Sequence, residues 1–210
     1  MAGRNSLHGN APDQSPAAML VIDMVNDLEF PQGRRLLPRA LAIARRIAAL
    51  KSRARAAGIP VVYANDNFGR WRSDFWQAVE HCLRDGVRGR PLAELLKPDD
   101  SDYFVLKPKH SGFYATPLGT LLDYLGARRL ILTGISGDTC VLATAMDAYL
   151  RDFELHVPRD CLASISPAHN RAALAYMQRV LHADVRDSAR IDVRALARRG
   201  RRPARPSARA

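Results

Sequence analysis

The chain has 210 residues and a net charge of +11, with 47% hydrophobic and 25% charged residues. This length supports one domain with a substantial core, and the composition excludes a chain disordered throughout, a collagen-like repeat and a disulfide scaffold. Three cysteines cannot all pair, which predicts a free thiol and a cytoplasmic location. The N-terminal residues lack the apolar stretch of a signal peptide and no apolar run could span a bilayer, so no membrane association is expected.

Positive charge is concentrated at the C-terminal end, where residues 198–210 hold six arginines and no acidic residue. Because this stretch has no apolar face, we predict disordered segments at 198–210 and at 1–16, around a folded domain at 17–197. The arginines could touch nucleic acid or an acidic surface nonspecifically. A solvated tail is the simpler interpretation, and nucleic acid is not expected as a specific partner.

Strand-like apolar runs alternate with helical patterns along the chain. We predict strands at 19–24, 59–64, 103–107, 129–135, 153–157 and 183–187, and helices at 38–57, 74–86, 118–125, 139–151 and 167–181. This alternation is typical of a parallel sheet with helices on both faces, and continuously apolar strands agree with it. We therefore predict a single α/β domain. The less regular segment 66–101 is the candidate for a lid or specificity region.

Three polar residues lie at the ends of predicted strands. Asp23 interrupts the apolar run LVIDM, Lys107 ends YFVLK, and Cys140 follows LILTGISGDT. Singly, each has a structural explanation: a paired carboxylate, a lysine reaching solvent and a small buried hydrophobe. Together they lie at the carboxyl ends of parallel strands, where such sheets place their ligands. A nucleophile, a carboxylate base and a cation are the parts of an acyl-transfer site.

The thiol of Cys140 is placed at a predicted helix N-terminus, with Asp138 or Thr139 as the N-cap. The helix dipole and Lys107 should lower its pKa, whereas Asp23 should raise it. We expect the first two to offset the carboxylate only in part, which leaves a thiol that Asp23 must deprotonate. Lys107 is two strands from Asp23, roughly 10 Å away, so its side chain must reach over the edge of the sheet.

Three segments carry a resemblance to a known superfamily: LVIDMVND at 20–27, LKPKHSGFYATPL at 106–118, and LTGISGDTCVLATAMDAYLRDFELHVPRDC at 132–161. With these motifs the sequence resembles the isochorismatase-like cysteine hydrolases, which include nicotinamidases and N-carbamoylsarcosine amidohydrolase. The resemblance implies a six-stranded parallel sheet in the order 3-2-1-4-5-6, flanked by helices. It also suggests a homo-oligomer, either a dimer or a tetramer.

The resemblance further implies an Asp-Lys-Cys triad of Asp23, Lys107 and Cys140. It implies a cis peptide bond between Ile135 and Ser136, which turns the Ser136 N–H inward. With the N–H of Cys140 it would form an oxyanion hole.

The chain departs from the superfamily at two places. Val25 stands where the family often has glutamine after IDM, with an effect that the sequence leaves open. The nicotinamidase branch carries metal-binding histidines after its second strand, whereas no histidine lies between residues 64 and 80 here. We therefore expect no metal and no other cofactor. Isochorismate hydrolysis does not need the cysteine, so Cys140 favours C–N bonds as the target.

Substrate contacts are predicted from polar and aromatic residues near the same strand ends. The candidates are Phe30, Asp66, Asn67, Trp71, Phe75 and Tyr114. The alternative for the stretch 65–76 is a surface turn whose aromatic side chains pack on the next helix. The histidines give no ligand spacing: His81, His110, His156 and His182 are scattered, and His169 is interpreted as a capping or packing residue. Cys82 and Cys161 are expected to be inert.

The sequence therefore predicts a metal-independent cysteine hydrolase that cleaves a C–N bond of a small amide or carbamoyl compound through a thioester. One alternative is an isochorismatase-type enol-ether hydrolase that does not use the thiol. Another is a non-catalytic scaffold that binds nucleic acid through its arginine-rich tail.

Overall fold

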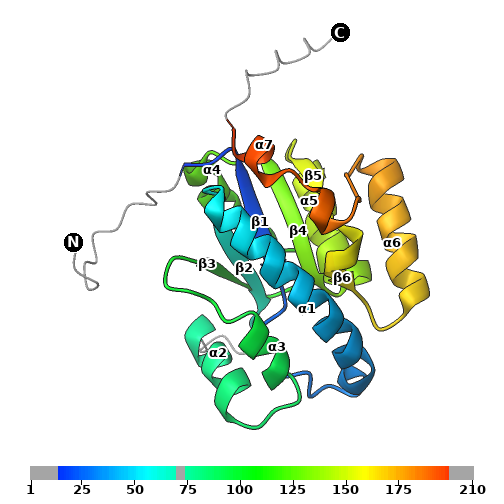
Figure 1. Ribbon diagram of the computed structural model, residues 1–210. Helices are drawn as coiled ribbons and strands as arrows, with labels where there is room; N and C mark the ends of the chain where they lie inside the picture. The colour runs from blue at the N-terminus through cyan, green and yellow to red at the C-terminus, as the bar shows by residue number, and fades with distance from the viewer. Residues whose placement is uncertain (1–13, 70–73, 199–210) are drawn as a thin grey trace, which may run out of the picture.

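The computed structural model describes residues 14–69 and 74–198 (Figure 1). The predicted disordered segments therefore fall almost entirely outside the described residues. The N-terminal boundary is corrected, because Ser15 and Pro16 belong to the packed domain. The Ser15 N–H donates to the carbonyl of Leu125, and the carbonyl of Pro16 accepts from the N–H groups of Arg128 and Arg129.

The centre of the domain is a six-stranded parallel sheet, as predicted. Its path is β3-β2-β1-β4-β5, with β6 paired to β4. The central strand β1 is buried at every residue, because helices cover both of its faces. The strands are β1 (Ala17–Ile22), β2 (Val61–Asp66), β3 (Tyr103–Lys107), β4 (Arg129–Ile135), β5 (Glu154–His156) and β6 (Leu162–Ala163).

The sixth strand is not the one predicted. Residues 183–187 make only an isolated parallel bridge, between Asp184 and His156 of β5. The sixth strand is instead the two-residue β6, which pairs with Gly134 and Ile135 at the end of β4. The order 3-2-1-4-5-6 is therefore corrected. β6 pairs with the carboxyl end of β4, beyond the residues that pair with the short β5, and it does not add a strand outside β5.

Alternate residues of the strands face two separate cores. Met19 and Val21 pack with α1, α2, α3 and α7, while Leu20 and Ile22 pack with α4, α5 and α6. Figure 1 shows α1 lying across one face of the sheet. The α-helices are α1 (Gly33–Ala56), α2 (Phe75–Arg84), α3 (Arg90–Leu95), α4 (Leu118–Leu125), α5 (Leu142–Tyr149), α6 (Pro167–Val180) and α7 (Val193–Ala197).

Short turns of other helix types complete the chain. They are the π-helical turn η1 (Gly137–Val141) and the 3-10 turns η2 (Arg159–Cys161) and η3 (Ser188–Arg190). The lid candidate 66–101 contains α2 and α3, which pack on the same face of the sheet as α1. Within the described residues, no helix has the length and apolar character needed to cross a membrane.

Gly134 lets β4 approach β1 closely just before the turn Gly137–Val141, which contains Cys140. It has φ of +121°, and a Cβ at this position would lie 2.0 Å from the carbonyl oxygen of Ile22. Any side chain here would push apart the two strands that carry Asp23 and Cys140. Glycine is therefore required by space as well as by conformation.

We expect Gly134→Ala to lower the free energy of unfolding by about 2 kcal/mol or more, because the new methyl group overlaps a backbone carbonyl. Urea unfolding measures this loss. The matched control is Gly119→Ala in α4, where a Cβ meets nothing within 4 Å. That change should leave stability unchanged or raise it by up to about 1 kcal/mol. Equal stability of the two variants would contradict the close-approach argument.

Candidate active site

The three strand-end residues meet around the ammonium group of Lys107. Its Nζ lies 2.9 Å from Asp23 Oδ2 and 3.6 Å from Cys140 Sγ. Asp23 follows β1, Lys107 ends β3, and Cys140 lies in η1 directly after β4. The sequence therefore identified three side chains that the fold brings together at the carboxyl edge of the sheet.

The intervening strand β2 explains how Lys107 reaches Asp23. Asp66, at the end of β2, pairs with Lys107 in register, and its N–H donates to Asp23 Oδ1 over 2.7 Å. Asp23 itself adopts φ of +52°, so the chain leaves the line of β1 at this residue. The carboxylate is thus bound by the backbone of β2 on one oxygen and by the lysine of β3 on the other.

Both charged partners are buried. Lys107 is 0% exposed and Asp23 is 5% exposed. Burial raises the pKa of Asp23 above its usual value, against the opposing effect of Lys107. Burial alone would lower the pKa of Lys107, but Asp23, Cys140 and Asp66 together outweigh it, and this pKa is raised. The lysine therefore stays charged, and its charge is matched within the site.

The environment of Cys140 favours the protonated thiol. Burial, followed by the negative charge of Asp23, raises its pKa to about 12, and Lys107 offsets this only in part. This agrees with the expectation of a thiol that a base must deprotonate. The expected N-cap is corrected: Asp138 and Thr139 lie inside η1, which begins after Ser136 with no side-chain cap.

The loop after β3 is fastened to the helix that follows Cys140. The Thr144 hydroxyl donates to the carbonyl of Cys140 over 2.7 Å and accepts from the N–H of Gly112 over 3.0 Å. The Ser111 hydroxyl donates to the carboxylate of Asp147 on α5. Between these contacts and Lys107, the exposed side chain of His110 places Nδ1 3.7 Å from Cys140 Sγ.

Three residues of this site were missed by sequence reasoning. His110 was interpreted as one of several scattered histidines, although its place three residues after Lys107 is a signal that could have been used. Ser164 accepts from the N–H of Asp138 over 3.1 Å and donates to Asn170 over 2.9 Å. Asn170 leaves no room for a Cβ at Gly137. Ser164 and Asn170 therefore pack against Gly137 and Asp138, in the turn that contains Cys140.

The backbone before Cys140 contains the expected cis peptide bond. The peptide between Ile135 and Ser136 is cis, at the position that the resemblance implies. The N–H groups of Thr139 and Val141 both bond to the carbonyl of Ser136, which closes the turn that presents Cys140.

The predicted substrate-contact residues divide into three groups. The Asp66 side chain is half-exposed beside Lys107, and Phe30 and Tyr114 are exposed. Asn67 is buried, and its amide oxygen accepts from the N–H of Gly69. Trp71 lies outside the described residues.

Phe75 is a correction. It is 1% exposed and packs between Tyr63 and Phe104, with ring centroids 5.7 Å and 4.8 Å away. It is therefore a core residue that offers no surface to a substrate; it belongs to α2 and packs on residues of β2 and β3, not on a following helix as the alternative interpretation has it.

The donor groups of the site do not fit a metal ion. Among the described residues, no group of three or more histidine, cysteine or acidic side chains is placed to hold one. Asp66 Oδ1 accepts from the N–H of Phe68, and Oδ2 lies 3.7 Å from Lys107 Nζ. A cation at the end of β2 would have to compete with this ammonium group.

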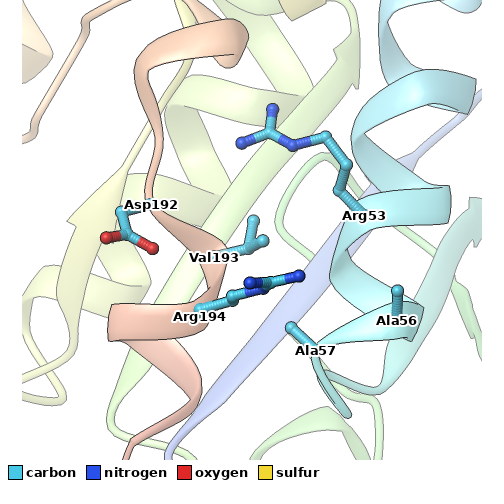
Figure 2. A pocket seen from close by; sticks show the side chains of 6 residues that line it. All are labelled: Arg53, Ala56, Ala57, Asp192, Val193 and Arg194. Carbon is cyan, nitrogen blue, oxygen red and sulfur yellow. The ribbon is translucent and has the colours of Figure 1, made fainter.

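Two surface hollows lie apart from the triad. One has a volume of about 300 Å³ and lies between the end of α1 and α7 (Figure 2); it is lined by Arg53, Ala56, Ala57, Asp192, Val193 and Arg194. Another, of about 610 Å³, is lined by Arg35, Pro38, Arg39, Ile165 and Ser166. Neither includes a triad residue.

Comparison with known proteins places this geometry in a family. The family model described as the isochorismatase domain matches residues 17–190. The chain belongs to the isochorismatase family. It is a hydrolase of this family with a single α/β domain.

Individual relatives agree with this assignment. The isochorismatase family protein YaaI of Bacillus subtilis is 42% identical over 168 residues, which cover 80% of this chain and 92% of the relative. Ureidoacrylate amidohydrolase RutB of Methylobacterium radiotolerans is 30% identical, over 80% of this chain and 75% of that protein. The crystal structure of N-carbamoylsarcosine amidase from Thermoplasma acidophilum is 31% identical, with a TM-score of 0.64 over 84% and 98% of the two chains.

The raised pKa of Cys140 predicts how its reactivity depends on pH. With the pKa raised to about 12, the thiolate fraction should grow with pH, so the rate of alkylation by iodoacetamide should rise from about pH 5 to about pH 9 without a plateau. Asp23→Asn removes a negative charge that raises this pKa, and should speed alkylation at a given pH by about tenfold.

Peptide mass spectrometry separates Cys140 from the buried Cys82 and Cys161, which serve as internal controls. A rate that is already constant near pH 5 would show a preformed thiolate and contradict the prediction.

Proposed function

We propose that the protein hydrolyses a C–N bond of a small amide or carbamoyl compound through a thioester on Cys140. The observation that carries this proposal is the placement of one buried ammonium group, Lys107 Nζ, against both Asp23 and Cys140. A carboxylate, a cation and a thiol in mutual contact supply a base, a charge balance and a nucleophile. The amide-cleaving relatives, RutB and N-carbamoylsarcosine amidase, support a C–N bond as the target.

In the first half of the reaction, Asp23 takes the proton from the Cys140 thiol, which lies against the same Lys107 ammonium group. The sulfur electron pair forms a bond to the carbonyl carbon, and the carbonyl π electrons move to oxygen. The N–H groups of Ser136 and Cys140 would hold this oxyanion. When the oxyanion collapses, the C–N bond breaks and the leaving nitrogen takes the proton from Asp23, which leaves a thioester.

In the second half, Asp23 is again a carboxylate and accepts a proton from water. The water oxygen adds to the thioester carbon, and the C–S bond breaks on collapse. The released sulfur recovers a proton from Asp23, which restores the resting state. Lys107 orients Asp23 throughout and holds its positive charge beside whichever of the two partners is anionic.

Substrate binding is proposed for Asp66, which lies beside Lys107, and for two exposed aromatic residues. Asp66 offers a carboxylate at the end of β2, and Phe30 and Tyr114 offer apolar surface. Asn67 and Trp71 follow Asp66 in the chain and remain candidates for the same side of the pocket. A small polar substrate would then bind between the end of β2 and the loop that follows β3.

We expect Cys140→Ala and Asp23→Asn each to lower turnover at least about a thousandfold, because each removes a group that forms or breaks a bond. A screen of small amides, ureas and carbamates supplies the substrate, and mass spectrometry of the quenched reaction detects the acyl adduct on Cys140. Cys82→Ala, at a buried site in α2, is the matched control and should retain turnover.

Different results would favour the other two interpretations. Full activity of Cys140→Ala, with turnover of an enol ether, would indicate an isochorismatase-type reaction. Salt-sensitive binding to nucleic acid that is lost on deletion of residues 198–210, without turnover of any substrate, would indicate a scaffold.

A homo-oligomer, either a dimer or a tetramer, and a cytoplasmic location are also proposed. Met146, Tyr149 and Leu150 are exposed apolar residues at the i, i+3, i+4 spacing that places them on one face. A contact of this face with a second copy would cover them. Light scattering of the purified protein measures the mass in solution. The three free thiols fit a reducing compartment.

A further inference from the structure

We infer that His110 is a fourth active-site residue, which donates a hydrogen bond from Nδ1 to Cys140 Sγ and stabilises the thiolate as Asp23 takes the proton. The inference rests on the proposed nucleophilic role of Cys140. It starts from the contact of 3.7 Å between Nδ1 and Sγ, which lies within the range of hydrogen bonds to sulfur.

The position of His110 is set by contacts on both sides of it in the chain. On one side, Lys107 Nζ donates to the carbonyl of Lys109 over 3.2 Å, so the group that orders the triad also holds the residue before His110. On the other side, Ser111 and Gly112 are bound to side chains of α5. These contacts fix the backbone around His110 beside Cys140.

The hydrogen atoms around the sulfur can be assigned consistently. The thiol has one proton, which in the proposed reaction passes to Asp23, and Lys107 Nζ donates to the sulfur over 3.6 Å. An N–H at His110 Nδ1 then gives the sulfur a second donor. When the thiol proton moves to Asp23 and the electron pair stays on sulfur, both donors face an anion, and hydrogen bonds to an ionised acceptor are about twice as strong as neutral ones.

The two donors act from different environments. Lys107 is fully buried and also bonds to Asp23 and the carbonyl of Lys109, so its charge is shared among several acceptors. His110 is exposed, and Cys140 Sγ is its hydrogen-bond partner within the described residues. It therefore stands on the solvent side of the sulfur, where a substrate arrives, and an imidazole there can serve the thiolate without weakening the Lys107–Asp23 pair.

Three variants test the role. His110→Leu removes the donor at similar size, His110→Asn keeps a side-chain N–H close to the position of Nδ1, and His182→Asn removes an exposed imidazole beyond the end of α6 as a control. Asparagine tolerates the φ of +54° at residue 182. Because His110 is exposed, His110→Leu should fold with an unchanged melting temperature, which is measured first.

The readout is the rate of Cys140 alkylation by iodoacetamide at a fixed pH, which reports the thiolate without any substrate. We expect His110→Leu to be slower by about tenfold, His110→Asn to recover most of the rate, and His182→Asn to match the unchanged protein. Turnover of a substrate found in the screen should fall in His110→Leu through kcat rather than KM.

An unchanged or faster alkylation rate in His110→Leu would overturn the inference, because the ring would then only shield the sulfur. Equal losses in His110→Leu and His110→Asn would also overturn it, since the N–H would not matter. Failure of the proposed function is distinct: it would show as full turnover in Cys140→Ala, whatever the His110 variants do.

Discussion

The ammonium group of Lys107 is the constraint on which the site depends. It is wholly buried, and a buried cation of this kind is tolerated only when paired and hydrogen-bonded. Its partners come from three different places in the chain: the carboxylate of Asp23, the sulfur of Cys140 and the carbonyl of Lys109. Because one group satisfies all three, loss of any one partner changes the charge balance felt by the other two.

The sheet is built so that these partners can meet. Close approach of β4 to β1 requires glycine at position 134. The Asp66 N–H donates a hydrogen bond to Asp23 and so orients its carboxylate toward β3, where Lys107 lies. The turn that contains Cys140 is held in place by β6. This strand pairs with the last residues of β4 and places Ser164 where it accepts from the N–H of Asp138. The short sixth strand therefore supports the loop that contains Cys140 and does not form an edge of the sheet.

Much of this could be predicted from the sequence. Strands at 103–107 and 129–135 and the helix at 118–125 have the predicted bounds, because apolar runs with clear flanking signals define them. Asp23, Lys107 and Cys140 could be singled out because each is a polar residue at the end of an apolar strand. Taken singly, each residue supports an active site only weakly. Their shared position at the carboxyl ends of the strands makes the interpretation specific.

What the sequence could not predict depends on contacts between distant segments. A two-residue strand such as β6 leaves no periodic pattern, and the π-helical turn η1 differs from an α-helix only in its hydrogen bonds. The sequence around an aromatic residue does not distinguish a side chain that packs in the core from one that lines a pocket. The prediction of Phe75 as a substrate contact is wrong for this reason. Ser164 and Asn170 lie far from Cys140 in sequence, and only the folded chain shows them beneath its loop.

The resting charge state of the site follows from the same contacts. Burial, followed by the negative charge of Asp23, raises the pKa of the Cys140 thiol, while Lys107 opposes the rise that burial causes in the pKa of Asp23. A thiolate formed in advance would react with any electrophile, whereas in the proposed mechanism the thiol gives its proton to Asp23 when a substrate carbonyl is in place. The burial that makes the cluster of Asp23, Lys107 and Cys140 costly to assemble is thus also what raises the pKa of its thiol.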